Sequence, residues 1–424
     1  MASTELTVPI RPRPTVWIPV FLIVFAGAAS TGHRAGAEQT LASPSISVRD
    51  VRVRLAADAT RVRVRSDAMI QVADPSGPRK SPLDAESWHV FTSAGRAIRC
   101  GDRRFAADGV TLHTGGYGSM TVAFDRGAGW SPSRRYPGRV DLRCLDDGTL
   151  EVINAVDVEQ YVSSVVAHEI WPTFEREAYR AQAIAARTYV LYAMIHRRNA
   201  AYDVKAGQGS QVYRGIRADD TGRQAAEAAW YTRGIVSTWG AGDGGRLFSA
   251  FYSAVCGGVT QSAARFGDEH DIKPLSGGAK CDFCKDAPGE TYRWGPVRID
   301  KNELRSRLVA RNPKAGFSGS ITKIEVIDRS PQGRPIKLEI IGSTGKPLEL
   351  SAESFRLAVG AERMRSTDCT IRVTKRHIVI ENGRGFGHGI GLCQWGSQGL
   401  AQRGKAAAEI LCFYYPGSRL ARAY

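Results

Sequence analysis

Residues 161–192, YVSSVVAHEIWPTFEREAYRAQAIAARTYVLY, decide the fold, because their pattern predicts two helices separated by a break. Before the break, Tyr161 and several valines recur at helical spacing, and Pro172 then stops the pattern. After the break, two glutamates occupy a first helical turn, where carboxylates suit the helix dipole. A face of small residues follows, which allows another backbone to come close. The break places Glu169 at the end of the first helix.

Glu169 is the candidate catalytic residue. Its neighbours along the two helices are apolar, namely Val165, Val166, Ile170, Trp171 and Phe174. A carboxyl group in such surroundings loses hydration, which favours the protonated form and raises its pKa. A glutamate of this kind can act as a general acid near neutral pH. The local sequence leaves a second interpretation open, a solvated glutamate at a helix end.

Composition and charge limit the classes of partner. The chain has 424 residues, enough for two or three domains with their own cores, and its 43% hydrophobic content is ordinary for a globular protein. The formal net charge of +16 favours an anionic partner, such as nucleic acid or an acidic cell-wall polymer. The basic residues are spread thinly, without a Lys/Arg-rich block or a helix-turn-helix signature. We therefore expect no nucleic-acid partner.

Residues 1–37 are typical of a secretory signal. Arg11 and Arg13 precede an apolar run at 16–29, and the sequence Ala-Gly-Ala at 35–37 resembles a cleavage site. The run is shorter than the ~20 residues of a membrane-spanning helix, so an uncleaved anchor is the second interpretation. No other segment predicts a membrane span. We expect a secreted, periplasmic or envelope-associated protein.

The rest of the chain predicts an α+β fold. Short runs with alternating valine and arginine at 45–150 indicate a strand-rich N-terminal domain. We interpret the arginine face of these strands as a charged edge rather than a binding surface. The catalytic core is expected in two parts, residues 151–293 and 382–424, with a strand-rich insertion at 294–381 between them.

The second part of the core contains a glycine-rich loop. Glycines alternate from Gly385 to Gly391, which indicates close approach to a ligand or to another backbone. A helix is predicted around residues 406–414, and Pro416 and Gly417 end it.

The eight cysteines allow two kinds of chemistry. Outside the cytosol, disulfides are the default expectation. Cys281 and Cys284, in CDFC, instead have the spacing at which two thiolates hold one metal ion.

Two separated stretches carry a family resemblance. Residues 161–191 and residues 383–417, GRGFGHGIGLCQWGSQGLAQRGKAAAEILCFYYPG, resemble signatures of the stage II sporulation protein D / LytB family. The segments between them agree and stand in the right order: QVYRG at 211–215, FYSAVCGGVTQSA at 251–263, CDFC at 281–284 and YRW at 292–294. The resemblance covers roughly residues 141–424.

The resemblance implies a secreted or membrane-anchored protein that acts on peptidoglycan. Sporulation members are lytic transglycosylases, which cut peptide-free strands between N-acetylmuramic acid and N-acetylglucosamine and leave a 1,6-anhydro end. Their catalytic glutamate, in the motif VVxxE, corresponds here to Glu169. LytB-type members are described as modifiers of cell-wall amidases, so a non-catalytic, wall-binding partner of an amidase is the alternative.

This chemistry needs one carboxyl group. Hydrolytic glycosidases usually need two, one as acid and one as base or nucleophile. In an intramolecular cut, the sugar's own 6-hydroxyl is already in place, so proximity replaces an activated water. We predict Glu169 as the single acid and base, and no cofactor is expected for the reaction. Nearby Glu159, Glu175 and Glu177 are interpreted as charges on helix surfaces.

Four residues are candidates for substrate binding. Gln182 and Arg187 lie in the family's AQAxAART helix and could bind a sugar acetamide or the muramic carboxylate. A structural ion pair is the alternative for Arg187. His388, inside GFGHGIG, and Gln394 are expected to line the cleft.

The cysteine motifs are expected to meet in the fold. Cys256, Cys281, Cys284 and Cys393 would close a tetrahedral structural zinc site without an open position for catalysis. His270 would replace Cys393 if that residue is not a ligand, and two disulfides are the rival arrangement. Cys100 and Cys144 are a candidate pair, and Cys369 and Cys412 are expected as buried free thiols.

Overall fold

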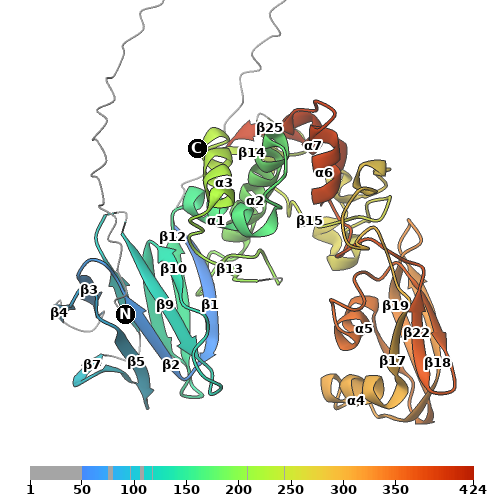
Figure 1. Cartoon of the computed structure of the whole chain (residues 1–424), viewed down its shortest axis with the longest axis horizontal. Helices are drawn as coiled ribbons and strands as arrows, with labels where there is room; N and C mark the ends of the chain where they lie inside the picture. Colours follow the sequence, from blue (N-terminus) through green and yellow to red (C-terminus); the bar gives the residue numbers. More distant parts are fainter. Residues whose placement is uncertain are drawn as a thin grey trace, which may run out of the picture. The chain divides into compact units, whose positions relative to one another are not determined.

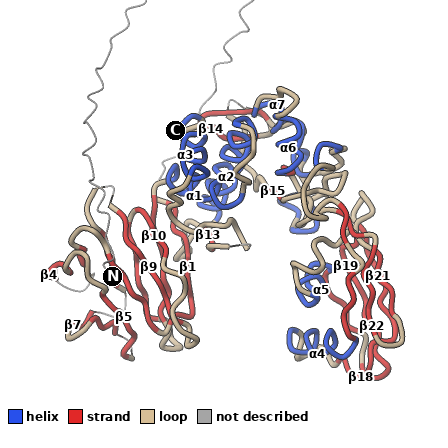
Figure 2. The backbone as a smooth tube through the Cα atoms, viewed as in Figure 1, coloured by secondary structure: helices blue, strands red, loops and turns tan. Residues whose placement is uncertain are grey.

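The computed structural model describes residues 50–424 except 75–79, 96, 106–108, 117, 208 and 243. The signal predicted at 1–37 lies outside the described residues. The described residues confirm the α+β class and the strand-rich N-terminal part (Figures 1 and 2). Within them, no helix has the length and apolar character of a membrane span.

The N-terminal part contains two sheets. The first has seven strands in the spatial order β13 (Val204–Lys205), β1 (Val51–Ala59), β12 (Leu150–Val156), β11 (Arg139–Cys144), β8 (Val110–His113), β3 (Ile70–Ala73) and β4 (Lys80–Leu83). The second has six strands in the order β10 (Arg134–Pro137), β9 (Ser119–Asp125), β2 (Arg61–Arg65), β5 (His89–Ala94), β6 (Ala97–Cys100) and β7 (Arg103–Phe105).

The alternation of valine and arginine places the core. In β2, Val62 and Val64 are fully buried, while Arg61 is exposed and Arg63 and Arg65 are partly exposed. Strand β12 departs from this pattern, because all seven of its residues are buried. It pairs with β1 on one side and β11 on the other, and it leads directly into the first helix.

Three helices follow the sheets: α1 (Val158–Glu169), α2 (Arg176–His196) and α3 (Asp220–Tyr231). The predicted break is confirmed, since α1 ends at Glu169 and α2 begins seven residues later. Asp157 caps α1 by accepting hydrogen bonds from the N–H groups of Glu159 and Gln160. Five alanines of α2 are fully buried, as expected for a face that other backbone approaches: Ala178, Ala181, Ala183, Ala185 and Ala186.

The C-terminal segment returns to this helical region. Its elements are β24 (Leu392–Cys393), α6 (Gln394–Ala401), α7 (Ala407–Tyr414) and β25 (Arg419–Arg422). Strand β25 pairs with β14 (Ile235–Thr238), and β24 pairs in parallel with β15 (Tyr252–Ser253). Four short 3-10 turns lie between: Ala264–Phe266, Asp268–His270, Lys273–Leu275 and Asp282–Cys284.

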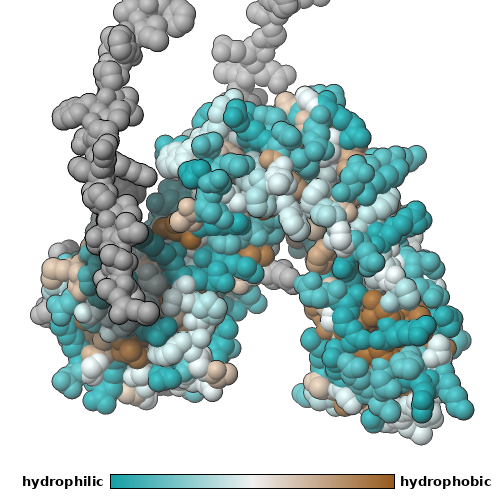
Figure 3. Space-filling view, viewed as in Figure 1, coloured by the Kyte–Doolittle hydropathy of each residue, from teal (hydrophilic) through white to brown (hydrophobic). Residues whose placement is uncertain are grey.

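The insertion has its own buried core. It is made of β16 (Arg293–Trp294), β17 (Val297–Asp300), α4 (Lys301–Arg311), β18 (Phe317–Arg329), β19 (Pro335–Gly345), β20 (Leu348–Ser351), α5 (Ala352–Val359), β21 (Thr370–Val373), β22 (His377–Glu381) and β23 (Gly383–Arg384). On the face drawn in Figure 3, apolar residues gather over this insertion, and Ile327 and Leu357 are among its exposed large apolar side chains.

A buried ion pair joins the three helices. Glu159, expected on a helix surface, is 2% exposed, and that expectation was wrong. Its carboxylate accepts hydrogen bonds from Arg187 at 2.5 and 3.1 Å, from the Gly234 N–H at 3.1 Å and from the Tyr424 hydroxyl at 2.6 Å. Arg187 also donates to carbonyl oxygens of Ala229 and Ile235. The pair ties α1 and α2 to the end of α3 and to the chain terminus.

Breaking this pair should destabilise the protein strongly. Glu159→Gln leaves the Arg187 charge buried without a counter-charge, so we expect a loss of about 3–5 kcal/mol in the free energy of unfolding, measured by urea denaturation. Glu159→Leu combined with Arg187→Met should cost less than the two single changes together, because neither charge is then buried alone.

An exposed ion pair supplies the control. Glu325→Gln removes the partner of Lys323, whose side chain is 61% exposed, and should change the same free energy by less than ~1 kcal/mol. A Glu159→Gln protein as stable as this control would contradict the assignment of the pair as a structural centre.

Candidate active site

Glu169 is held at the point where α1 ends. Its Oε1 accepts a hydrogen bond from the Val212 N–H at 2.8 Å and from the Tyr252 hydroxyl at 3.4 Å. Among the described residues, none donates to Oε2 at hydrogen-bonding distance. One carboxyl oxygen is therefore anchored, and the other is available to carry a transferable proton.

Burial sets the protonation of this carboxyl group. Loss of hydration raises the pKa of Glu169, and the Val212 N–H, Tyr252, Gln394 and the charge of Arg214 oppose that rise. The net shift is upward because one backbone N–H and a long hydroxyl contact do not replace the lost water. The direction is the one expected from the apolar sequence around Glu169.

The loop that supplies the Val212 N–H is fixed on both sides. The Tyr161 hydroxyl donates to Gln211 Oε1 at 2.9 Å, and the Tyr213 hydroxyl donates to Asn154 Oδ1 at 2.6 Å. The rings of Tyr161 and Tyr213 also stack, with 5.2 Å between their centroids. Because both neighbours of Val212 are held by buried partners, its N–H has one direction, toward Glu169.

The glycine-rich loop supports the site indirectly, through the segment at 251–257. A Cβ at Gly391 would lie 2.0 Å from the Phe251 carbonyl oxygen, and one at Gly385 would lie 2.6 Å from that of Val255. Of the two sequence interpretations, approach to another backbone is therefore the one observed. The loop packs against the segment that carries Tyr252, and it leads through β24 to Gln394.

Gln394 lies beside the carboxyl group, where the sequence analysis placed it. Its side chain is 5% exposed and its amide lowers the pKa of Glu169, although no described acceptor lies within normal hydrogen-bonding distance of its Nε2. Ser253 Oγ, from the strand paired with β24, is also buried without a partner. Buried polar atoms of this kind are normally satisfied, so the unpaired Gln394 amide beside Glu169 marks a place where a ligand can bind.

His388 braces the glycine-rich loop. Its Nδ1 accepts a hydrogen bond from the Ile390 N–H at 3.0 Å, and its ring lies edge-on to those of Phe251 and Phe266. Burial, together with the smaller effect of neighbouring arginines, lowers the pKa of His388 to about 3, so the ring is neutral. No described contact joins it to Glu169 directly; its backbone hydrogen bond is with Tyr252.

Two of the expected substrate contacts are corrected by burial. Arg187 is 0% exposed and its guanidinium is engaged in the ion pair with Glu159, so the structural alternative describes it. Gln182 is also 0% exposed, inside α2, and its amide atoms have no partner among the described residues. Neither side chain reaches a surface that a glycan could contact.

Aromatic side chains flank the end of α1. Trp171 is 51% exposed and its ring lies 5.9 Å from that of Trp395, which packs edge-on against Phe174 at 4.9 Å. One residue separates Trp171 from Glu169 in the sequence, and Trp395 directly follows Gln394. An exposed indole in this position offers an apolar face on which a sugar ring can pack.

The four expected cysteines meet in the fold. The Sγ atoms of Cys256, Cys281, Cys284 and Cys393 all lie within 4.8 Å of one another, and all four residues are buried. The Sγ atoms of Cys256 and Cys284 are 3.7 Å apart, too far for the ~2.05 Å bond of a disulfide. Four sulfurs around one zinc at ~2.3 Å would be roughly 3.8 Å apart, so the donor set and its spacing fit that ion.

The remaining cysteines are free in the structure. Cys100 and Cys144, expected as a pair, are not bonded to each other. Cys412 was expected to be buried and is exposed, while Cys369 is partly buried. His270, the substitute for Cys393, contacts Glu269 and the Phe251 ring, and the cysteine cluster is complete without it.

Tertiary contacts add residues that the sequence analysis did not assign. The Val212 N–H and the Tyr252 hydroxyl come from the motifs QVYRG and FYSAV, which were noted for the resemblance but given no role. A backbone N–H carries no residue-type signal, so only its position reveals it. The described residues form an α+β protein with the half-buried carboxyl group of Glu169 at the end of α1.

Comparison with known proteins identifies relatives of this chain. The sequence model of the Stage II sporulation protein family matches residues 146–239, and that of a domain of unknown function matches residues 280–391. An uncharacterized protein of Brachyspira hyodysenteriae is 32% identical over 272 residues, which are 63% of this chain and 68% of that protein.

Two relatives from Bacillus subtilis are also similar. Stage II sporulation protein D is 26% identical over 286 residues, which cover 64% of this chain and 76% of that protein. Amidase enhancer is 25% identical over 298 residues, covering 61% of this chain and 40% of that protein. The chain belongs to the stage II sporulation protein D / LytB family.

The raised pKa of Glu169 predicts a pH-dependent cost to stability. Below the ordinary carboxyl pKa of 4.5 both folded and unfolded states are protonated, so the group costs nothing; the cost grows as pH rises through the raised folded-state value. Glu169→Gln should therefore raise the melting temperature at pH 7.5 by on the order of 1–3 °C and leave it unchanged at pH 3.5.

The exposed Glu175→Gln is the matched control, and thermal melts at both pH values are the measurement. An equal melting temperature for Glu169→Gln and its parent at pH 7.5 would contradict the desolvation of this carboxyl group.

Proposed function

We propose that the protein is a peptidoglycan lytic transglycosylase with Glu169 as its single acid and base. The observation that carries this proposal is the half-buried Glu169 carboxyl, anchored through Oε1 and open at Oε2. Membership of a family that includes Stage II sporulation protein D supports it. The substrate is a glycan of alternating N-acetylmuramic acid and N-acetylglucosamine, free of stem peptides.

In the first step, the protonated Glu169 donates its proton from Oε2 to the glycosidic oxygen. The bond between that oxygen and C1 of the muramic sugar breaks, and positive charge develops at C1. The raised pKa keeps a larger share of Glu169 in the acid form, which this step requires. The exposed Trp171 indole can hold an adjacent sugar ring against the helix end.

In the second step, the Glu169 carboxylate accepts the proton of the sugar's own 6-hydroxyl. The oxygen of that hydroxyl bonds to C1, which gives the 1,6-anhydro end and returns Glu169 to its protonated form. The Val212 N–H and the Tyr252 hydroxyl stabilise the carboxylate between the two steps, since each donates to Oε1. No second carboxyl group is needed.

A non-catalytic role is the second candidate. One relative is named Amidase enhancer, and the net charge of +16 suits a protein that binds an anionic wall polymer. In that case the protein would bind peptidoglycan and stimulate a cell-wall amidase without cleaving sugar bonds. Either role would place it outside the cytoplasm, secreted or at the cell envelope.

We also propose a structural zinc ion bound by Cys256, Cys281, Cys284 and Cys393. Cys393 caps α6, its Sγ accepting from the Gly396 N–H at 3.4 Å, and it directly precedes Gln394. The ion would fix the start of α6 and hence the Gln394 amide beside Glu169. Four protein ligands leave no open coordination position, so its role is structural.

Glu169→Gln tests the enzymatic proposal. It should fold, bind peptide-free glycan strands, and reduce release of anhydro-disaccharides by at least about 100-fold, because a positioned acid/base contributes ~10²–10⁴ in rate. Mass spectrometry of the soluble products is the measurement. The Glu175→Gln protein should retain full release, since its exposed carboxyl lies outside the site.

An assay of the unmodified protein distinguishes the two candidate functions. A transglycosylase releases anhydro-sugars from purified strands, whereas an amidase enhancer sediments with them and releases none. Release by Glu169→Gln at the parent rate would remove Glu169 from the proposed role.

Metal analysis tests the zinc proposal. Protein purified without added metal should contain about one zinc per chain, and denaturation with a chelator should free eight titratable thiols. Cys281→Ser should lose the zinc and lower the melting temperature, whereas the exposed Cys412→Ser should change neither. Zinc-free protein with four fewer titratable thiols would instead indicate two disulfides.

A further inference from the structure

A basic cavity adjoins the site on the side of the N-terminal strands. Its volume is ≈ 300 Å³. Its wall includes Phe124 and Arg134 from the second sheet, Arg126 directly after β9, and Val212 and Arg214 from the loop after β13. Val212 is the residue whose N–H is bonded to Glu169, so the cavity and the carboxyl group share a wall. The loop is held there by the Ile216 N–H, which donates to the Arg135 carbonyl oxygen at 2.7 Å.

Two of the three cavity arginines have no counter-charge. Arg126 is engaged, since its Nε lies 2.5 Å from Asp58 Oδ1 and its guanidinium stacks on the Phe124 ring. For Arg134 and Arg214, no carboxylate of residues 50–424 that the structure describes lies within ion-pair distance. Two unneutralised guanidinium groups on one cavity are a site for an anion.

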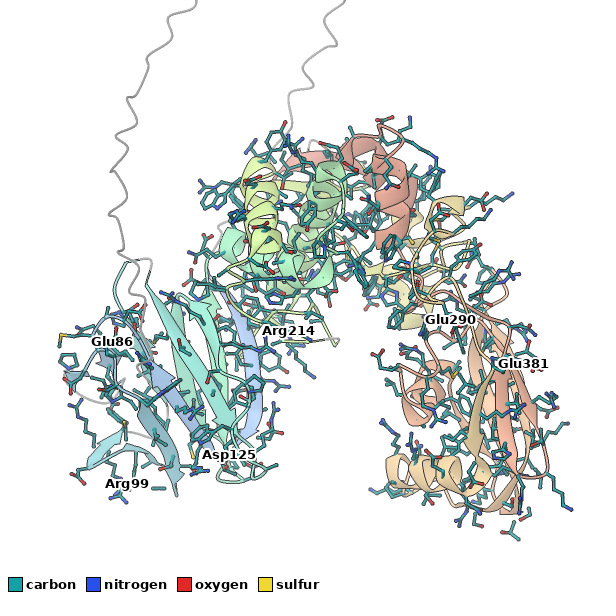
Figure 4. The ribbon with its side chains drawn as sticks, in the orientation of Figure 1. Glu86, Arg99, Asp125, Arg214, Glu290 and Glu381 are labelled. Carbon is teal, nitrogen blue, oxygen red and sulfur yellow. The ribbon has the colours of Figure 1, made fainter. Side chains whose placement is uncertain are left out.

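The charges of this pair act on the end of α1. Burial lowers the pKa of His168, next to Glu169, and Arg214 and Arg134 lower it further. Burial raises the pKa of Tyr136, in the cavity wall, to about 12 against the effect of the same two arginines. The side chain of Arg214 stands at the junction between the strands and the loop below the helices (Figure 4).

We propose that Arg134 and Arg214 form a carboxylate subsite that binds the acidic group of the glycan next to the bond being cut. Arg134 belongs to β10, so the strand-rich N-terminal part contributes a specificity-determining residue to a site otherwise made by the helical core. This inference rests on the proposed function. It assigns to these arginines the carboxylate contact that the sequence analysis considered for Arg187.

The subsite distinguishes two forms of the substrate. In a peptide-free strand, the lactyl group of the muramic sugar ends in a carboxylate, which an arginine can bind through two parallel hydrogen bonds. In a peptide-bearing strand that group is a neutral amide, which offers no negative charge and only one acceptor oxygen. The cavity therefore selects strands from which an amidase has already removed the peptides.

The test compares two substrates and two sets of variants. Peptide-free strands are used as prepared, and also after their carboxylates are converted to methylamides. The variants are Arg134→Gln with Arg214→Gln, and Arg99→Gln as control. Arg99 is exposed on β6, far from Arg214 in Figure 4, so its change tests nonspecific loss of positive charge.

The unmodified protein should cleave carboxylate strands with a kcat/KM about 10- to 100-fold above that for methylamide strands. The Arg134→Gln, Arg214→Gln protein should lose most of this ratio, through a higher KM on carboxylate strands and little change on methylamide strands. The Arg99→Gln protein should keep it. An equal loss on both substrates, or a ratio retained by the double variant, would overturn the proposal.

A binding measurement separates this proposal from the enzymatic one. In the Glu169→Gln background, the two arginine changes should weaken the binding of carboxylate strands, measured by sedimentation. The factor should equal the increase in KM on these strands, and the binding of methylamide strands should not change. If the unmodified protein cleaves nothing but this difference in binding persists, the proposed activity fails and the subsite stands. If cleavage occurs without any difference, the subsite fails alone.

Discussion

The hydrogen bond from the Val212 N–H to Glu169 Oε1 is the contact on which the site depends. It joins the last residue of α1 to a loop that starts from a strand of the N-terminal sheet. The loop keeps its direction because the Tyr161 hydroxyl donates to Gln211 of the loop and the Tyr213 hydroxyl of the loop donates to Asn154 of β12. A single backbone donor thus orients the carboxyl group without supplying enough solvation to keep it fully charged.

Distant segments serve this contact in different ways. The glycine-rich loop packs so closely against residues 251–257 that side chains there would collide with backbone, and this fixes Tyr252 over the carboxyl group. The cysteine cluster holds the start of α6, and with it Gln394. The ion pair of Glu159 and Arg187 joins α1 and α2 to the end of α3. Each group of the site is therefore held by a separate part of the chain.

The proposed function and the carboxylate subsite make different uses of charge. The acid needs a low-dielectric setting, which burial among apolar residues provides. An anionic substrate needs positive potential, which Arg134 and Arg214 provide on a more exposed cavity wall. The two requirements conflict if they are met at one point, because a guanidinium beside Glu169 would lower its pKa. The charge of Arg214 does oppose the upward shift of the Glu169 pKa, but no ion pair joins the two groups and the loss of hydration outweighs this effect.

Local sequence patterns were enough to predict the helices around Glu169 and the buried face of the strands. The spacing of apolar residues and Pro172 determined two helices, their break and the position of Glu169, because helix periodicity and termination are local properties. The alternation of valine with arginine determined the buried face of the strands in the same way. Other roles depended on what lies opposite in space. Arg187 and Gln182 were expected at the substrate and are buried, whereas Arg134 and Val212 were assigned no role and lie at the site. Residue type gives a side chain its chemistry, but only tertiary packing decides whether a buried carboxylate, a backbone N–H or open solvent faces it.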